Sequence, residues 1–479
     1  MTGASPPGDE SAKATSKLWG GRFQEPPADE MWRFTVDHTD RRLLDIDVEG
    51  SLAHVAMLGK VGLLDPGEQR AITEGLSRIL SEANGGSFVF LETDEDVHSA
   101  VERRLVELVG EVGEKLHTGR SRNDQMALDL RLYLRRAASA RGQQLSRFAG
   151  LLADIAERHS ETSIPSYTHL QQAQITSLGH HLLAYAWMAL RDRDRLADLN
   201  NRLESPIGAG ASAGSSLPID PQATASGLGF ARSFDNSLDA VGSRDLVTEF
   251  VFDVTQAMVH LSRLSEELIL WSSSEFGWVT FPDSHTTGSS ALPHKKNPDI
   301  AELARGRAAA AIGDLTTLLV LQKGLPLAYN RDLQEDKPPL FRADDALGGA
   351  LEALGGMLSG AEFHPPPPGP WTATLDLAEA LVQRGMPFRQ AHEAVGRLVG
   401  ILVGSGRTPA DASRADLTAA DSRFEAGDLD LLDPATSLSR RRTPGSGTPD
   451  SVRAQIERIR QALAAAPDRS KADSGTSAS

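Results

Sequence analysis

The chain is 479 residues long, and 40% of it is hydrophobic and 24% charged, which is typical of a globular protein with a sizeable core. It has no cysteine, which excludes disulfides, thiolate metal sites and a thiol nucleophile, so any catalysis must use oxygen and nitrogen groups. A formal net charge of −16 argues against general nucleic-acid binding, and no apolar run is long enough to cross a bilayer, so we expect neither nucleic acid nor membrane as a partner.

Both ends of the chain are predicted to be disordered, with three helical domains between them. Residues 1–17 and 466–479 are rich in Ser, Ala, Asp and Gly and have few large apolar side chains. The N-terminal stretch also lacks the apolar segment of a secretory signal, which favours a cytoplasmic location. The predicted domains are an N-terminal helical domain at 18–121, a central helical bundle at 122–371 and a C-terminal helical domain at 372–465.

From about Leu43 onward the chain is predicted to be mainly α-helical, with one short strand at 87–91. The first motif follows at 113–125, GEKLHTGRSRNDQ, where a cation-rich turn precedes a predicted helix. Arg120 and Arg122 carry planar guanidinium groups that suit carboxylates, and the helix N-terminus adds backbone donors, so a ligand with two carboxylates can be clamped here. The alternative is that Ser121 or Asn123 only caps the helix while the arginines pair with acidic side chains on the surface.

A second motif, YTHLQQAQ at 167–174, places His169 among hydroxyl and amide groups just before another predicted helix. A single histidine is more often structural than catalytic. Because this one is accompanied by two anion-binding motifs elsewhere in the chain, we interpret it as catalytic.

The central region is predicted to be a bundle of long helices. Apolar residues recur there at spacings of three and four, interrupted once at Ser265: Val247, Val251, Val254, Met258, Leu261 and Leu268. This spacing puts them on one face of a long helix. Weaker patterns of the same kind run over 125–159, 175–202 and 300–323. The segment HPPPPGP at 364–370 cannot continue a helix and indicates a boundary before the C-terminal region.

The most informative segment is Gly288–Pro298, GSSALPHKKNP. Its glycine and two serines give mobility, while Pro293 and Pro298 restrict the backbone. Such a loop can close over an anionic substrate, with Lys295 and Lys296 as countercharge and a serine against the reacting carbon. We interpret it as an active-site lid; the alternative is a surface turn before the next helix.

Two further features follow the lid. Glu302 lies near the start of the next predicted helix, where it can orient a histidine through a charge-assisted hydrogen bond or simply complement the helix dipole. The string LPLAYNRDLQEDK at 325–337 then gathers Tyr329, Gln334 and Lys337 in one loop. This density of long polar groups suits recognition of an amino-acid-like ligand, although it also fits a solvated connection between helices.

The string GSSALPHKKNP closely resembles the GSSxMPxKxNP signature of the fumarase/aspartase superfamily, whose members cleave C–N or C–O bonds and release fumarate. Within that superfamily the chain resembles argininosuccinate lyases. The strings that carry this resemblance are LWGGRF at 18–23, HTGRSRNDQ at 117–125 and YNRDLQEDK at 329–337, with further similarity at EDVHS (95–99) and PFRQAH (387–392). The resemblance covers nearly all of the chain except its two tails.

The resemblance implies a mainly α, three-domain fumarase/aspartase-like fold whose long central bundle forms a homotetramer with active sites shared between subunits. It also implies β-elimination of argininosuccinate to arginine and fumarate, in arginine biosynthesis, with no cofactor and no metal. Such an elimination removes a weakly acidic C–H next to a carboxylate and builds a doubly charged aci-carboxylate, so stabilising that charge is the main task of the site.

The resemblance also implies roles for individual residues. Ser289 is implied to remove the proton from the succinyl Cβ, and His169, paired with Glu302, to serve the complementary acid/base step, with the order of the two roles open. Lys295 is implied to stabilise the developing anion. The predicted substrate-binding residues are Arg120, Arg122, Asn123, Thr168, Ser290, Asn297, Tyr329, Gln334 and Lys337.

The sequence departs from the family pattern at three positions. Leu292 replaces a Met of the lid, which conserves volume, and Ile175 stands where the family generally has Pro. Asp37 stands where the family has a substrate-contacting Ser, and a carboxylate there repels an anionic group or attracts a cationic one.

Two alternatives therefore stay open. One is a related fumarate-releasing lyase that acts on another N-succinyl adduct, such as adenylosuccinate or a substrate of specialised metabolism. The other is a non-catalytic structural paralogue, like the lens crystallins of this family. The presence of Ser289, His169, Lys295 and Glu302 argues against the second.

Overall fold

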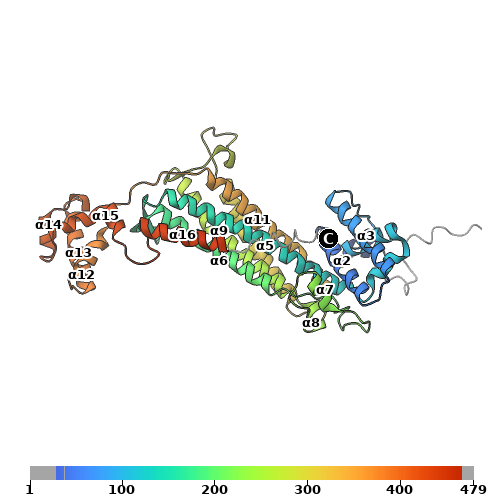
Figure 1. The fold of residues 1–479 in the computed structure, drawn as a ribbon. Helices are drawn as coiled ribbons and strands as arrows, with labels where there is room; N and C mark the ends of the chain where they lie inside the picture. The colour runs from blue at the N-terminus through green and yellow to red at the C-terminus, as the bar shows by residue number, and fades with distance from the viewer. Residues whose placement is uncertain (1–27, 37, 466–479) are drawn as a thin grey trace, which may run out of the picture. The chain divides into compact units, whose positions relative to one another are not determined.

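The computed structural model describes residues 28–36 and 38–465 of the chain (Figure 1). The predicted disordered segments, the motif at 18–23 and Asp37 lie outside the described residues. The chain divides between Thr118 and Gly119 into two compact units. The three domain boundaries expected from the sequence stay predictions.

The first unit, residues 1–118, is helical where it is described. Its elements are α1 (Asp29–Thr35), η3 (Thr39–Leu43), α2 (Leu44–Lys60), α3 (Pro66–Asn84), α4 (Val97–Val109) and η4 (Gly110–His117). Asp65 starts α3 through a capping box with Glu68, and Pro66 takes the first helical position, where its missing N–H costs nothing. Fully buried side chains of α2, α3 and α4, among them Val55, Leu58, Leu76 and Leu105, form its core.

The strand predicted at 87–91 is wrong. The backbone N–H groups of Ser87 and Phe88 both donate to the Glu82 carbonyl, so the start of the segment is bonded to the last turn of α3, and residues 87–91 form no regular secondary structure. The β-favouring residues pack locally instead, with the Phe88 and Phe90 rings 4.9 Å apart between centroids. No strand of this unit, as far as it is described, pairs with the segment.

The second unit, residues 119–479, is built on long helices that reverse direction at each connection, which confirms the predicted bundle. They are α5 (Arg122–Arg158), α6 (Leu178–Asn201), α9 (Asp245–Ser272), α10 (Asp299–Gln322) and α11 (Lys337–Ser359), several of which run side by side in Figure 1. Contacts between α6 and α9 show the antiparallel order: His181 meets Glu267, Asp192 meets His260, and Arg202 meets Glu249. Consecutive connections therefore lie at opposite ends of the bundle.

The apolar face predicted for the helix at 247–268 is confirmed in α9. All six predicted apolar residues are at most 5% exposed, and Ser265, which interrupts the pattern, is itself fully buried. Because serine is small, the helices can pack closely at this position, whereas a larger side chain would separate them.

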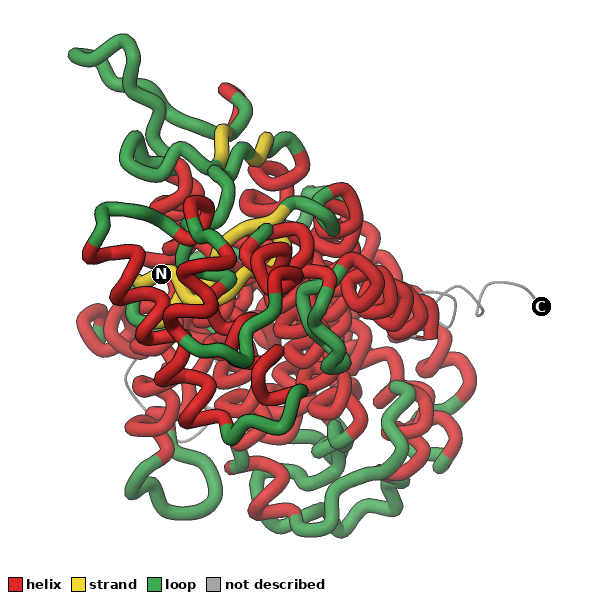
Figure 2. The backbone as a smooth tube through the Cα atoms, turned by 90° about the vertical axis from the view of Figure 1, so that its left-hand side faces the viewer, coloured by secondary structure: helices red, strands yellow, loops and turns green. Residues whose placement is uncertain are grey.

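The helix predicted from residue 175 begins later, at Leu178. Ser177 caps it by accepting the His180 N–H at 3.2 Å, and Ile175 belongs to a strand instead. That strand, β2 (Gln171–Ser177), pairs antiparallel with β1 (Ser163–Thr168), and a second short pair joins β3 (Val279–Thr280) to β4 (Glu362–Phe363). Figure 2 shows these strands as small yellow segments in a molecule that is otherwise helix and loop.

Shorter helices complete the second unit. They are α7 (Pro221–Gly227), α8 (Ser237–Gly242), η5 (Asp283–His285), η6 (Arg331–Asp336), α12 (Thr374–Gln383), α13 (Phe388–Gly404), η7 (Pro409–Asp411), α14 (Arg414–Ala420), η8 (Ala426–Leu432), α15 (Pro434–Ser439) and α16 (Pro449–Ala465). The helices α12 to α14 share a separate apolar core around Leu381, Leu398 and Leu417. The last helix, α16, returns to the bundle, where Arg460 pairs with Asp154 and Glu157 of α5.

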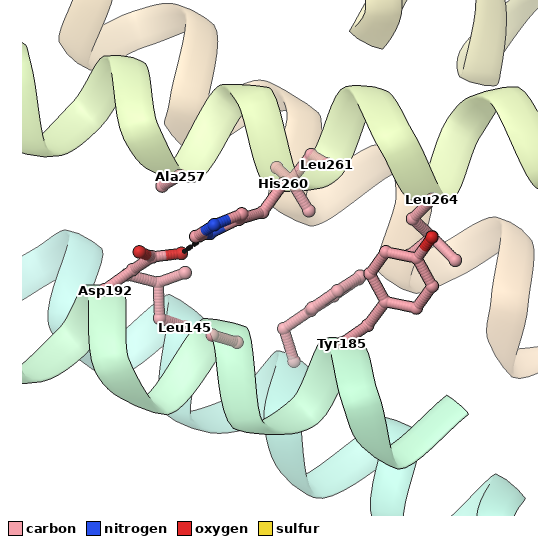
Figure 3. Close-up of a pocket in the computed structure, with 9 residues that line it drawn as sticks. Leu145, Tyr185, Asp192, Ala257, His260, Leu261 and Leu264 are labelled. Atoms are coloured by element: carbon pink, nitrogen blue, oxygen red, sulfur yellow. Dashed lines mark hydrogen bonds and ion pairs between the residues drawn. The ribbon is translucent and has the colours of Figure 1, made fainter. Parts of the chain in front are cut away.

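The middle of the bundle contains a buried polar pair. His260 Nδ1 lies 2.7 Å from Asp192 Oδ2 at the edge of a cavity of about 10 Å³, lined mainly by apolar side chains (Figure 3). A space of this size holds no more than about one water, so it is not a substrate site. None of the described helices combines the length and the hydrophobicity that spanning a membrane requires.

Candidate active site

The predicted His169 lies at the tip of the β1–β2 hairpin. His169 and Leu170 form the turn, and both have a φ of +55°, a left-handed conformation that is uncommon for residues with a side chain. Thr168 ends β1 beside them, and all three side chains are exposed. The hairpin thus holds Thr168 and His169 out from the bundle on a strained but well-defined turn. The motif precedes a helix, as predicted, but the hairpin that carries it was not predicted from the sequence.

Aromatic packing ties the hairpin to the segment that leads into the lid. The Tyr167 ring lies 6.0 Å from that of Trp278, which in turn stacks on Trp271 at 5.6 Å. Trp278 directly precedes β3, and the lid follows. We call the end of the bundle that carries β1, β2 and Gly288–Pro298 the hairpin end.

Hydrogen bonds hold the two ends of the lid together at its base, and the residues between them are mostly exposed. Thr287 and Asn297 pair through two backbone hydrogen bonds of 2.8 and 3.2 Å. Lys296 Nζ donates to the Phe281 carbonyl at 3.0 Å and to Asp283 Oδ1 at 2.6 Å, and it holds the pKa of that carboxyl below its usual range. Asn297 is therefore part of the base, with its side-chain amide 3.4 Å from the Thr287 hydroxyl.

The two predicted catalytic groups of the lid have different surroundings. Ser289 is half-buried, and its Oγ accepts the N–H groups of Ala291 at 3.3 Å and Leu292 at 3.2 Å. Backbone donors in this position stabilise negative charge on that oxygen. Lys295 and Ser290 are exposed, and the Lys295 ammonium has no hydrogen-bond or ion-pair partner within the described chain. It is available to a ligand.

Glu302 lies in the first turn of α10, exposed, at the foot of the lid. Across the described ranges no hydrogen bond or ion pair joins it to His169. The predicted pairing of these two residues stays a prediction, and a single chain does not supply it.

Arg120, Arg122 and Asn123 lie at the other end of the bundle, where α5 begins. Ser121 caps the helix, with its Oγ accepting the Asn123 N–H at 3.3 Å, while the roles of the two arginines stay predictions. Asn123 Nδ2 donates to the Ala211 carbonyl at 3.0 Å. Arg120, Arg122 and Asn123 are all half-buried. We call this the arginine end.

Tyr329, Gln334 and Lys337 lie at the arginine end too. Tyr329 packs against Ala209, Ala240 and Val241. Gln334 accepts a 2.8 Å hydrogen bond from Arg331 Nε. Lys337 is only 4% exposed, and its Nζ donates to Asp336 Oδ1 at 3.1 Å and to the Gln334 carbonyl at 3.3 Å.

Two buried carboxylates that the sequence analysis missed organise the arginine end. Asp336, 0% exposed, binds both Lys337 and the guanidinium of Arg244. Asp124, also 0% exposed, accepts backbone N–H groups from the N-cap of α5 and from a glycine-rich segment. Burial raises the pKa of Asp124, although these hydrogen bonds oppose the rise. Ser121-x-x-Asp124 is a capping-box pattern visible in the sequence, whereas Arg244 and Asp336 are 92 residues apart and carry no such signal.

The predicted site residues therefore form two groups at opposite ends of the bundle. The hairpin end carries Thr168, His169, Ser289, Ser290, Lys295, Asn297 and Glu302, and the arginine end carries Arg120, Arg122, Asn123, Tyr329, Gln334 and Lys337. Helix α5, with 37 residues, spans ~55 Å between them, and α10, with 24, spans ~36 Å. One small molecule cannot reach both groups of the same chain.

The outer face of α10 carries several exposed large apolar side chains among polar ones. Alanines such as Ala301, Ala304, Ala308 and Ala311 form its buried seam toward the bundle. On the opposite face Leu303, Ile312, Leu319 and Val320 are 49 to 63% exposed. Large apolar side chains on the exposed face of a helix are typical of a helix that packs in a larger assembly.

The chain matches a family model described as Lyase over residues 21–313 and one described as Argininosuccinate lyase C-terminal over residues 371–439. It is 45% identical to the argininosuccinate lyase of Desulforudis audaxviator over 456 residues, 94% of this chain and 99% of that protein. It is 47% identical to the argininosuccinate lyase of Thioalkalivibrio sulfidiphilus over 455 residues, 93% of this chain and 97% of that protein.

Solved structures with a similar fold include EDDS lyase in complex with formate, with a TM-score of 0.78 and 28% identity over 90% of this chain and 88% of that one. A class II fumarase from Schistosoma mansoni, with a TM-score of 0.67 and 14% identity over 82% of this chain and 90% of that one, shares the fold alone. The predicted mainly α, fumarase/aspartase-like fold is confirmed.

Proposed function

The chain belongs to the argininosuccinate lyase family, and we propose that it cleaves argininosuccinate by β-elimination to arginine and fumarate, as a step of arginine biosynthesis. The observation that carries the proposal is the lid, where a serine oxygen held by two backbone donors lies in the same short loop as a lysine, Lys295, that has no partner among residues 28–36 and 38–465. That is the pair of groups that abstraction of a proton next to a carboxylate requires.

The active site is built from more than one subunit. A complete site needs the groups of both ends, and α5 and α10 hold the two ends of one chain far apart. Antiparallel packing of a second copy brings the hairpin end of one subunit beside the arginine end of another. The strained hairpin tip and the lid then face groups that their own chain cannot offer.

A homotetramer supplies this packing. Four copies that bring their α10 helices together bury Leu303, Ile312, Leu319 and Val320, which a single chain leaves exposed. Association through an apolar helix face is favourable because it removes these side chains from water. Cytoplasmic location, expected from the N-terminal sequence, is part of the same proposal.

In the reaction, Ser289, whose Oγ is stabilised as a base by the Ala291 and Leu292 N–H groups, removes the proton from the succinyl Cβ, while Lys295 stabilises the negative charge that develops on the substrate carboxylate. Closing the lid excludes water, which strengthens each of these interactions. His169, oriented by Glu302 of another subunit, gives a proton to the leaving guanidino nitrogen.

The arginine end binds the rest of the substrate. Arg122 and Asn123 stand at the helix N-terminus of α5, where backbone donors and the helix dipole favour carboxylates. Tyr329, Gln334 and Lys337 line the neighbouring loop and contact the arginine-like part. Lys337 is buried below the surface of this loop because Asp336 binds its ammonium group, and it contacts the arginine-like part from that side.

A second candidate is cleavage of another N-succinyl adduct. Its support is the structural similarity to EDDS lyase, one variant of which has bound fumarate, at 27% identity and a TM-score of 0.78 over 92% of this chain and 91% of that one. Purified protein given argininosuccinate, adenylosuccinate and EDDS in turn separates the candidates, because released fumarate absorbs in the ultraviolet. We expect release from argininosuccinate; release only from another adduct contradicts the main proposal.

Shared sites are tested by mixing variants. His169→Asn disables the hairpin end and Lys337→Met the arginine end, so each homotetramer is inactive. Mixed assemblies, formed by dissociating and reassociating the two, contain sites with both ends intact and regain activity. The control is each variant dissociated and reassociated alone. Failure of mixed tetramers to regain activity contradicts sites built from different subunits.

A further inference from the structure

We propose that Asp124 is a positioning residue that fixes the glycine-rich segment Ser205–Ser216 against the first turn of α5, and that this segment forms a wall of the substrate site at the arginine end. The inference rests on the proposed function, because it concerns binding of the same substrate. No residue of the segment was among the predicted site residues.

Asp124 joins two parts of the chain that are far apart in sequence. Its Oδ1 accepts the Ser121 N–H at 2.8 Å, which closes the capping box of α5. Its Oδ2 accepts the N–H groups of Gly208 at 3.0 Å and Gly210 at 2.8 Å. The carboxylate is 0% exposed, so these backbone donors take the place of water around it. One buried group thereby sets the distance between the start of α5 and the segment.

The glycines have the conformation that these contacts need. Gly208 has a φ of +103° and Gly210 one of +63°, which residues with a Cβ rarely adopt. A Cβ on Gly208 would also come within 2.6 Å of Pro221 Cγ, and one on Gly210 within 3.0 Å of the Gly214 carbonyl oxygen. Glycine at both positions lets two N–H groups converge on one oxygen.

The segment touches two of the predicted substrate-binding residues. Its Ala211 carbonyl accepts the hydrogen bond from Asn123 Nδ2, and its Ala209 packs in the cluster that includes Tyr329. Residues 205–210 are buried, whereas 211 and 213–216 are exposed. The buried part is an anchor, and the exposed part, made of small side chains, leaves its backbone open to a ligand held by Asn123 and Tyr329.

Asp124 therefore acts through the residues it places and does not touch the substrate itself. If it is lost, Asn123 and the segment can move apart while the α5 helix and the bundle remain. The consequence is weaker binding of the part of the substrate that carries carboxylates, without loss of the groups that carry out the chemistry at the hairpin end.

The test is Asp124→Asn in the full-length assembled protein. The amide keeps the size of the carboxylate but has only one acceptor oxygen. Its NH2 group must therefore face either the Ser121 N–H or the two glycine N–H groups, which are donors themselves. The probe is fumarate, the product common to argininosuccinate and other N-succinyl substrates. We expect its Kd, measured by calorimetry, to rise about tenfold, as for loss of one well-formed hydrogen bond to a charged group. In turnover assays we expect KM to rise by a similar factor while kcat changes little.

Two further variants separate positioning from general stability. Asp416 closes the capping box of α14 in the same way, away from the site, so Asp416→Asn should lower the thermal midpoint and leave the Kd for fumarate unchanged. Gly210→Ala breaks the same junction from the other side, so its effect on binding and that of Asp124→Asn should be less than additive.

The inference is overturned if Asp124→Asn binds fumarate as tightly as the parent protein, or if its effect and that of Gly210→Ala simply add. Absence of argininosuccinate cleavage by the parent protein is a different result. It would refute the proposed substrate, while the fumarate titrations would still decide the role of Asp124.

Discussion

The hairpin end and the arginine end of the bundle hold their side chains in opposite ways. At the hairpin end Thr168, His169 and Lys295 are exposed, and the lid is bonded mainly at its base. At the arginine end Asp124 and Asp336 are buried and fix the surrounding loops through several hydrogen bonds each.

This difference indicates that one end of the bundle can move more easily than the other. Segments with few buried contacts open and close at low free-energy cost, as a lid must, whereas buried polar networks hold one geometry. The end that carries the proposed acid/base groups is therefore the adaptable one, and the end proposed to bind the rest of the substrate is held in one geometry. In the proposed shared site, one subunit contributes its hairpin end and another contributes its arginine end.

The largest effect on stability is expected at the arginine end. Asp336→Asn leaves the buried cations Arg244 and Lys337 without their carboxylate, which should lower the free energy of unfolding by about 3–5 kcal/mol. The measurement is the urea midpoint of the assembled protein. The matched variant at the hairpin end is Asp283→Asn, which breaks the exposed pair with Lys296 and should leave the midpoint unchanged. Equal shifts for the two variants contradict the comparison.

The largest effect on catalysis is expected at the hairpin end. Lys295→Met removes the ammonium proposed to stabilise the developing anion, which should lower kcat by about 10²- to 10³-fold with no change in the thermal midpoint. Fumarate release gives the rate. Lys296→Met is the control, since that ammonium is already bonded to Phe281 and Asp283, and it should cost less than Lys295→Met. Near-normal turnover of the Lys295 variant would refute the role proposed for it.

A pH effect is expected between the two ends, in the seam of α6 and α9. Burial, and then the nearby Glu249, raise the pKa of Asp253 to about 7. Between about pH 4 and 7 the unfolded chain has released this proton while the folded chain keeps it, so stability falls as pH rises through that window. Asp253→Asn should remove the cost and gain about 2 kcal/mol at pH 8, less than the full shift because water screens part of the cluster.

Unfolding midpoints of this variant at pH 5 and pH 8 provide the check. The gain should be larger at pH 8 and shrink toward acid pH. A variant that is less stable than the parent protein at pH 8 would show that Asp253 is ionised and favourably paired in the fold.

The smallest effect is expected at the hairpin tip. Leu170→Asn places a residue that tolerates the left-handed conformation at a position that is 79% exposed, so little packing is lost. We expect a gain of about 0.5–1 kcal/mol in the free energy of unfolding. Thermal denaturation measures it, and a loss would mean that Leu170 is buried against another subunit.

Much of the fold could be predicted from the sequence because the signals are local. The spacing of Val247, Val251 and Val254 predicts the buried face of α9, as observed. The role of Gly288–Pro298 as a lid stays a prediction. The strand at 87–91 failed because β-favouring residues form a strand only where a partner strand is available. The hairpin at 163–177 was missed because its turn uses His169 and Leu170 in place of the glycine or asparagine that usually indicates such a turn.

By itself the sequence determined which residue types gather in each motif, the helical period that sorts buried from exposed positions, and the family to which the chain belongs. Only the tertiary structure decided that these motifs fall at two ends of a long bundle, because that depends on helix length and on the direction of each connection. It also decided that Asp124 and Asp336 are buried anchors, since a carboxylate gains that role only from donors that folding brings to it from distant parts of the chain.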